Sequence, residues 1–482
     1  MALPAVAVAT LVLAGIALYQ TPLGHNAAVH QAAALAIHRG ERLYLDVLYP
    51  FGPGAALFNY LFVQVLGNAD GLPWLLDMLS ALACSLLMYL LTLRFTGSSL
   101  AGFSAGLLYP VIHYAGLKGV SGEAEPLALL FFLCAAASLF IRRVTLTLRV
   151  VLLGVCFGLS VLTLPSGVGL GIPLGLLVLR AAPEGKQVPA LVLFLLGLAG
   201  SMALCLIWIG GKEGLAAFWA QWWAGRTLPP PDARNWAATT GLIGGMIFTP
   251  FAFLVLAGFY GIWRGRYGPI GYLVWAWLAA GLLTSLIKLP DVQASWLPAI
   301  APLILAASAG METLTRRSRK QAWKLAGRAA FTLMIAAAIV SVGAERGQSR
   351  EHREAFRRLQ PVIEAVRSVG HGGSVFIWDW APQIFAKADR TPENGVLSLL
   401  YLQMKFKGAD AIFDARVDLE GSLPEMILVR RSVPGEGVGR KDGMAKRLPT
   451  VDPVMEGLLL DYYWLLKKEA GYEIFVLTSY SE

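Results

Sequence analysis

The chain has 482 residues, of which 56% are hydrophobic and only 15% are charged. Soluble proteins carry about 25% charged residues, so this composition excludes an ordinary soluble domain. The formal net charge is +9, but no basic repeat is interleaved with aromatic residues, and nucleic acid is therefore not an expected partner.

Continuous apolar runs recur through the first part of the chain, with the length of roughly 20 residues that a helix needs to cross a bilayer. We predict an all-α polytopic membrane bundle of about eleven transmembrane helices over residues 1–344. A soluble α/β domain is expected over residues 345–482. The predicted spans are residues 4–19, 72–93, 98–114, 126–141, 148–164, 166–182, 189–210, 241–263, 270–287, 294–310 and 327–343.

Lysine and arginine are more frequent in the connections that come after even-numbered spans than in the other connections. The positive-inside rule assigns the basic side to the cytoplasm. The N-terminus is then expected inside, and the C-terminal domain is expected on the extracytoplasmic face. The outer face carries three long connections, at residues 20–71, 113–126 and 211–236.

The first outer connection contains two predicted juxtamembrane helices, an amphipathic one over residues 26–40 and another over residues 55–67. Between them lies Asp46, flanked by Tyr44 and Tyr49 and followed by a Pro/Gly-rich stretch that predicts a rigid turn. A carboxylate close to hydrocarbon is costly unless it is solvated or paired, which invites a functional interpretation. The alternative is a loop acid that faces water.

Other polar residues on the outer side are further candidates. Glu123 and Glu125, with Asp46 and His113, could surround a divalent cation such as Mg²⁺ or Mn²⁺, although no spacing requires a metal. Outer cations are candidates for binding an anionic group, or are ordinary interfacial side chains. They are Lys118, Arg226, Arg234 and Lys288.

The third outer connection carries Trp219, Trp222 and Trp223 on one predicted helix face. This pattern is typical of an interfacial aromatic belt, and the sharper interpretation is a wall for a lipid chain, with Trp222 in contact. In the C-terminal domain we expect a helix over residues 345–369 and a strand over 374–380. A second, amphipathic helix is expected over 452–471 and a closing strand over 472–479.

The stretch "GERLYLDVLYPFGPGAALFNYLFVQVLG" resembles the first extracytoplasmic loop of GT-C fold glycosyltransferases, the superfamily of protein O-mannosyltransferases and the lipid A aminoarabinose transferase. In these proteins a G-x-x-x-Y-x-D pattern, here Gly40, Tyr44 and Asp46, precedes a Gly/Pro turn. "SGEAEPLALLFFLCA" resembles their acidic second loop and "DVQASWLPAIAPLILAASAG" their late span. "SVFIWDWAPQIFAKADRTP" resembles the start of their periplasmic domain.

The resemblance implies a glycosyltransferase of the bacterial inner membrane. Such an enzyme moves a sugar from a polyprenyl-phosphate donor to an extracytoplasmic glycolipid, polysaccharide or protein. Family members often place an Asp-Glu pair before the glycine, and its Asp is the usual base, but His25 and Asn26 stand at the equivalent positions here. We therefore expect Asp46 to act as base, with His25 as second candidate and Glu125 orienting the acceptor.

Two other functions stay open. A membrane transporter or lipid flippase would place ionisable residues near mid-membrane and often shows inverted repeats, whereas the acids singled out above lie in outer loops. A non-catalytic scaffold with the same fold would explain the missing Asp-Glu pair. The sequence does not distinguish between possible sugars or acceptors.

Overall fold

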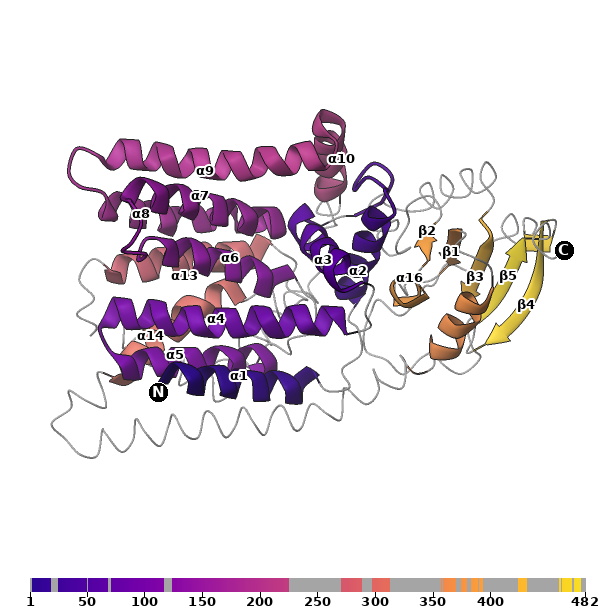
Figure 1. Cartoon of the computed structure of the whole chain (residues 1–482), viewed down its shortest axis with the longest axis horizontal. Helices are drawn as coiled ribbons and strands as arrows, with labels where there is room; N and C mark the ends of the chain where they lie inside the picture. Colours follow the sequence, from indigo (N-terminus) through magenta and orange to yellow (C-terminus); the bar gives the residue numbers. More distant parts are fainter. Residues whose placement is uncertain are drawn as a thin grey trace.

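The protein is seen as a computed structural model in which a layered bundle of helices lies beside a small sheet (Figure 1). The predicted spans at 241–263 and 327–343 lie outside the described residues. The structure describes residues 2–18, 25–49, 51–67, 71–116, 124–224, 270–287, 297–312, 357, 359–369, 374–378, 383–388, 390–392, 424–430, 459–460, 462–469 and 472–477.

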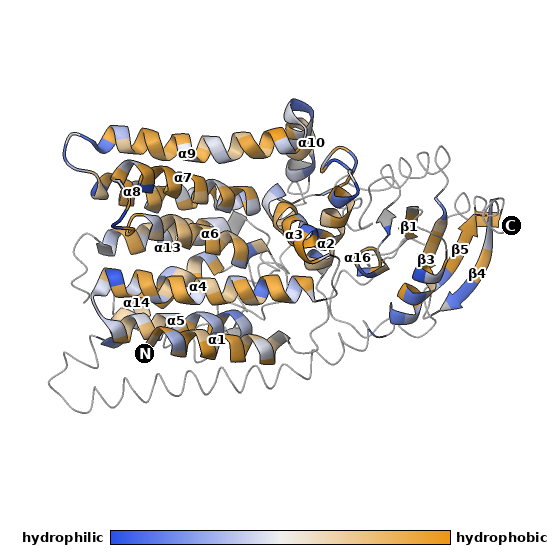
Figure 2. Ribbon diagram, in the orientation of Figure 1, coloured by the Kyte–Doolittle hydropathy of each residue, from blue (hydrophilic) through white to orange (hydrophobic). Residues whose placement is uncertain are grey.

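Helices occupy the predicted spans that fall within the described residues, and their surfaces are mostly apolar (Figure 2). Three of the described helices, α4, α7 and α9, are long and apolar enough to cross a membrane. The total of about eleven spans stays a prediction. The helices of the bundle are α1 (Ala2–Leu18), α4 (Leu72–Thr96), α5 (Ser99–Val111), α6 (Ala124–Ser138), α7 (Leu146–Thr163), α8 (Gly171–Ala181), α9 (Gln187–Trp208), α13 (Ile270–Ile287) and α14 (Leu297–Glu312).

Helix α4 shows how the sequence sets the helix ends. Pro73 lies in its first turn, where the missing N–H costs no helical hydrogen bond. Gly97 ends the helix in the left-handed region, with φ 69°, and its N–H donates to Leu93 O. Ser98 then caps α5, because its side chain accepts a hydrogen bond from the backbone N–H of Ala101.

Helices α7 and α9 pack with their backbones in contact. A Cβ atom at Gly154 would overlap the carbonyl oxygen of Phe194, and one at Gly197 would overlap that of Val151. Small residues at a helix crossing allow such close packing, which is a main source of association energy in a bilayer.

Two short helices, α2 (His25–His38) and α3 (Pro53–Leu66), lie between the bundle and the sheet (Figure 1). They confirm the predicted helices of the first outer connection. The amphipathic character expected for the first of them is wrong, because residues 27–36 are buried on every face. Helix α2 packs against α3 and also against α16 (Gln383–Ala388) of the C-terminal region, so it has no face left for the membrane surface.

The C-terminal region contains a mixed five-stranded sheet in the order β2-β1-β3-β5-β4. Strand β1 is parallel to β2 and β3, whereas β5 is antiparallel to β3 and β4. The predicted first and last strands are confirmed, and residues 359–368 are helical as expected. The strands are β1 (Ser374–Trp378), β2 (Thr391–Pro392), β3 (Met426–Arg430), β4 (Tyr463–Glu469) and β5 (Tyr472–Leu477).

The helix predicted over residues 452–471 is wrong from residue 463 onward, because residues 463–469 form β4, whereas the described residues 459–460 and 462 are helical. The segment "LLKKE" favours a helix locally. Pairing with β5 overrides that preference, since the antiparallel register runs from Tyr463 opposite Leu477 to Glu469 opposite Tyr472. Long-range pairing thus decides the structure of a locally ambiguous segment.

The C-terminal region is docked onto the bundle through one continuous apolar cluster. This cluster joins α2, the turn between α2 and α3, the helix α10 (Gly211–Ala224) and the inner face of the sheet. Lys387 of α16 lies 5.2 Å from the ring centroid of Trp74 in α4, a cation–π distance. The sheet therefore rests on the end of the bundle from which the first outer connection emerges.

Candidate functional site

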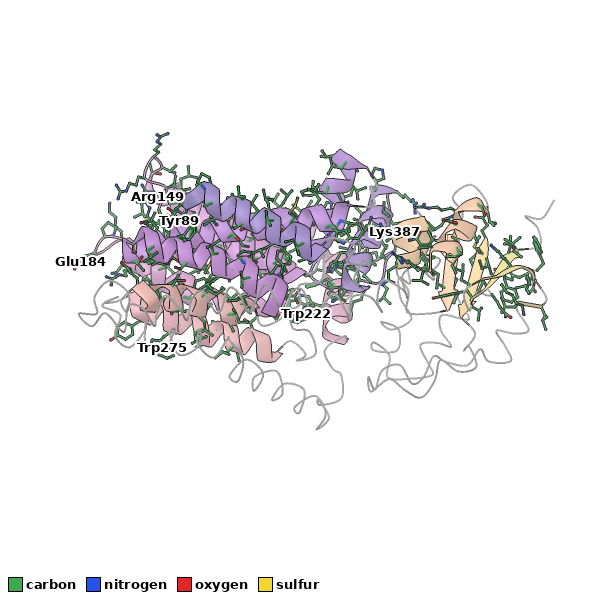
Figure 3. All side chains as sticks on the ribbon, turned by 90° about the horizontal axis from the view of Figure 1, so that it is seen from below. Tyr89, Arg149, Glu184, Trp222, Trp275 and Lys387 are labelled. Atoms are coloured by element: carbon green, nitrogen blue, oxygen red, sulfur yellow. The ribbon has the colours of Figure 1, made fainter. Side chains whose placement is uncertain are left out.

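The elements predicted on the outer face gather at one end of the bundle. The turn between α2 and α3, helix α10 and the sheet all lie there (Figure 1). Arg149 follows the connection after the fourth predicted span, on the predicted cytoplasmic side, and it lies at the opposite end, far from Lys387 (Figure 3). The structure therefore separates the two predicted sides, which is the arrangement a site at the outer end requires.

Asp46 belongs to a tight turn that Arg42 closes. The carboxylate oxygen Oδ2 accepts hydrogen bonds from the backbone N–H of Arg42 at 2.8 Å and from its Nε at 3.2 Å, while Oδ1 accepts from Nη2 at 3.2 Å. The Asp46 side chain remains 38% exposed. These hydrogen bonds from Arg42 lower the pKa of Asp46, so the carboxylate stays ionised in neutral solution.

Tyr44 has an uncommon backbone conformation, which is stabilised by two hydrogen bonds within the turn and a third from α10. Its φ is 71°, a region that non-glycine residues rarely occupy without support from their surroundings. The backbone N–H donates to Val47 O at 3.0 Å and the hydroxyl donates to Phe51 O at 2.7 Å. Burial raises the pKa of the Tyr44 hydroxyl well above its ordinary value, so Tyr44 acts as a neutral donor that fixes the turn.

Gln221 of α10 clamps the same turn from the other side. Its Nε2 donates to Tyr44 O at 2.7 Å, and its Oε1 accepts from Tyr49 N at 2.9 Å. The Tyr49 hydroxyl lies 2.7 Å from His30 Nδ1 in α2. Sequence reasoning missed Gln221, because a single glutamine beside tryptophans gives no local sign of a partner that lies 177 residues away.

The Pro/Gly stretch after the turn is fixed in place, as predicted, because its backbone lies against the end of α7. A Cβ atom at Gly52 would overlap the carbonyl oxygen of Leu162, and one at Gly54 would overlap Thr163. Only glycine leaves room for this approach to the end of α7. The turn is therefore pressed onto the bundle, and α3 starts from a fixed point.

The aromatic face of α10 covers the turn. Phe218 meets the ring of Tyr44 at 5.2 Å between centroids, edge to face. Trp222 is half-buried and packs on Trp219 at 5.3 Å, and Trp219 remains 48% exposed. The structure thus brings together the predicted residues Tyr44, Tyr49 and the helix that carries Trp222.

Glu125 lies in the first turn of α6 and is fully buried. A carboxylate is favoured there by the positive end of the helix dipole. Its two neighbours in the chain, Ala124 and Pro126, line a cavity of about 10 Å³, which is enough room for one water molecule. The other residues around this cavity are Ala55, Asn59, Leu76, Asp77, Ser80 and Leu127.

Asp77 is a functional candidate that sequence reasoning missed. It is a lone acid in the apolar helix α4, and its side chain is 1% exposed. Tyr114 donates a hydrogen bond to Asp77 Oδ2 at 2.9 Å, and His113 Nε2 lies 3.5 Å from Asp77 Oδ1. The signal was present in the sequence, since an ionisable residue inside a membrane span is expensive.

Several predicted site residues lie outside the described part of the chain, and they stay predictions. They are Glu123, Lys118, Arg226, Arg234 and Lys288. His25 begins α2, but its side chain is not among those described. Within the described residues, no three His, Cys, Asp or Glu side chains gather as they would around a metal ion.

Comparison with known proteins identifies the fold. No protein-family model matches the chain, and no curated protein matches it in sequence. The crystal structure of ArnT from Cupriavidus metallidurans bound to undecaprenyl phosphate matches with a TM-score of 0.67 at 11% identity, over 98% of this chain and 97% of that one. The chain has an ArnT-like GT-C fold.

The apo state of the same ArnT matches with a TM-score of 0.62 at 12% identity and the same coverage. The resemblance to the lipid A aminoarabinose transferase, which we drew from the loop motifs, is thereby confirmed for the fold. The apolar helices and the ArnT-like fold together indicate an integral membrane protein.

Proposed function

We propose that this protein is an extracytoplasmic glycosyltransferase of the bacterial inner membrane. It takes a sugar from a polyprenyl-phosphate donor and passes it to a glycolipid, polysaccharide or protein acceptor. The observation that carries the proposal is the ArnT-like fold along 98% of the chain. ArnT was crystallised with undecaprenyl phosphate, and the same class of lipid suits an apolar bundle with a polar end.

The reaction needs a base, a correctly positioned donor and a positive charge that stabilises the anionic leaving group. The acceptor hydroxyl loses its proton to the base, its oxygen bonds to the anomeric carbon, and the bond from that carbon to the phosphate oxygen breaks. Polyprenyl phosphate leaves with the electron pair. The outer cations Lys118, Arg226, Arg234 and Lys288 are proposed to stabilise it.

Of the three predicted catalytic residues, Glu125 has the surroundings that best suit a general base. It is fully buried in the first turn of α6, where its chain neighbours Ala124 and Pro126 line a small cavity, and such burial limits access of water. Asp46 is held by Arg42 with a lowered pKa, which makes it a weaker base and favours a role in fixing the turn. His25 remains the second candidate base.

A flippase or transporter is the second candidate, and Asp77 is the observation that favours it. Transporters keep ionisable residues inside their spans. Asp77 lies five residues after the first residue of α4, about 8 Å along the helix at 1.5 Å per residue. This depth is near the outer end rather than the midplane, and it suits a surface enzyme better.

The test is sugar transfer by the full-length protein in nanodiscs, with radiolabelled sugars on synthetic undecaprenyl phosphate. Transfer to cell-envelope glycolipid by the parent and its loss in Glu125→Gln are the expected results. Assays with Mg²⁺, Mn²⁺ or EDTA test the predicted divalent cation, and Asp46→Asn and His25→Ala test the other two residues. Movement of labelled lipid across the liposome bilayer, without sugar transfer, would favour the flippase instead.

A further inference from the structure

Two adjacent residues after α5, His113 and Tyr114, both contact the carboxylate of Asp77. After α5 the backbone widens into a π-helical turn over Ile112–Gly116, a distortion that is common at functional sites. His113 and Tyr114, which are adjacent in this turn, both approach Asp77 of α4. An ordinary α-helix would direct neighbouring side chains about 100° apart.

The polar atoms of this group are buried and only partly satisfied. Tyr114 is 3% exposed, and the side chains of Asp77 and His113 are 1% exposed. Among the described residues, no hydrogen-bond partner is present for either ring nitrogen of His113 or for Asp77 Oδ1. Such atoms are costly in a packed interior, and their presence beside a π-helical turn points to a role beyond packing.

The cavity beside Asp77 also borders the first turn of α6, which carries the proposed base. Asp77 lines it on one side, and Ala124 and Pro126, the neighbours of Glu125, line it on the other. One water molecule fits the space of about 10 Å³. A water held there would lie between Asp77 and the first turn of α6.

We propose that Asp77, His113 and Tyr114 form a buried proton relay that receives, by way of Glu125, the proton released by the acceptor hydroxyl. This inference rests on the proposed function. Tyr114 holds Oδ2 of Asp77, which leaves Oδ1 to face His113 Nε2 at 3.5 Å. Asp77 and Tyr114 are positioning residues, and His113 stores the proton as an imidazolium paired with the Asp77 carboxylate.

Every proton and bond in the proposed step is accounted for without a further reagent. The O–H bond of the acceptor breaks, and its proton passes to Glu125, through the cavity water to Asp77, and on to His113. The bond from the acceptor oxygen to the sugar forms as polyprenyl phosphate departs. After the product leaves, the proton returns to water along the same path. Among the described residues, the other titratable groups near the relay are Tyr109, stacked on the His113 ring at 5.9 Å, and Cys84 beside it.

The first test does not depend on activity. The full-length protein is labelled with ¹⁵N-histidine in nanodiscs, and the resonances of His113 among the six histidines are assigned from their loss in His113→Gln. Asp77→Asn is expected to change the ¹⁵N shift of His113 Nε2. Thr92→Val, which removes a different buried polar group of α4, is the matched control and should leave that shift unchanged. Identical His113 spectra in the parent and in Asp77→Asn would overturn the relay.

The second test measures turnover in the same nanodiscs. Asp77→Asn and His113→Gln are expected to lower kcat about 10²-fold, to leave the KM of the donor within twofold, and to raise the solvent isotope effect. Tyr114→Phe keeps the aromatic ring, and its kcat is expected to lie between that of these two variants and that of the parent. Parental kcat and isotope effect in all three variants would overturn the relay. If the parent itself transfers no sugar, the proposed function fails, and the His113 spectra still decide whether the relay exists.

Discussion

Asp46 and Asp77 both lie at the end of the bundle that meets the sheet, yet their surroundings are opposite. The Asp46 side chain is 38% exposed, and both of its carboxylate oxygens accept hydrogen bonds from Arg42, so water screens its charge. Asp77 is buried in α4 between Tyr114 and His113, where each polar contact is stronger and each missing one is costly. Asp46 thus fixes a loop, whereas Asp77 is the carboxylate that we propose to carry protons.

The largest effect should come from the turn's backbone contact rather than from either charge. Gly52→Ala places a methyl group against the carbonyl oxygen of Leu162, and neither backbone can yield easily. We expect a loss of about 3 kcal/mol or more, measured as a fall in Tm in detergent. Gly200→Ala in α9 is the control, since a Cβ there meets nothing within 4 Å. A parental Tm for Gly52→Ala would show that the turn is not pressed onto α7.

Removing the buried carboxylate should come next. Asp77→Ala leaves the Tyr114 hydroxyl and His113 without their shared partner, and we expect a loss of about 3 kcal/mol. Asp46→Ala should cost at most about 1 kcal/mol, because exposed ion pairs contribute little. Denaturation of the two variants side by side measures the difference. Equal losses would contradict the contrast between the two aspartates.

A substitution at Gln221 tests how strongly α10 stabilises the turn that contains Asp46. Gln221→Leu leaves the buried Tyr49 N–H and the Tyr44 carbonyl unpaired, which we expect to cost about 2 kcal/mol. Gln64→Leu, in which the replaced glutamine is exposed on α3, is the control and should lie within about 0.5 kcal/mol of the parent. A similar stability for both variants would mean that α10 does not clamp the turn.

The smallest effect is the pH dependence of the Arg42–Asp46 turn. Because the folded pKa of Asp46 is lowered, its stabilisation is present above the unfolded value near pH 4 and is lost as the pH falls through the folded pKa. The parent should therefore lose a small increment of stability below about pH 4 that Asp46→Asn does not lose. Parallel stability curves for the two proteins in that range would contradict the assignment.

Local patterns in the sequence were enough to predict the helices and the fixed loop. The apolar runs predicted the helices, and the Gly40–Tyr44–Asp46 motif with its Pro/Gly turn predicted the loop, because glycine and proline act on their own backbone. The sequence did not predict β4, whose structure depends on pairing with β5. It also did not predict Gln221 or the approach of His113 to Asp77, since these contacts join distant helices.

Asp77 could have been found from its sequence alone. A single acid within 25 otherwise nearly uncharged residues is a stronger sign of function than an acid in a loop. A local Gly/Tyr/Asp motif marks Asp46 in the sequence, whereas the burial of Asp77 depends on how α4 packs against α5 and α6.

The central claim is that the bundle receives a polyprenyl-phosphate lipid at its outer end. Native mass spectrometry of the full-length protein with undecaprenyl phosphate, and with uncharged undecaprenol as the matched control, tests it most directly. We predict saturable binding of one undecaprenyl phosphate that undecaprenol does not displace. Equal binding of the two lipids, or binding of neither, would contradict the account.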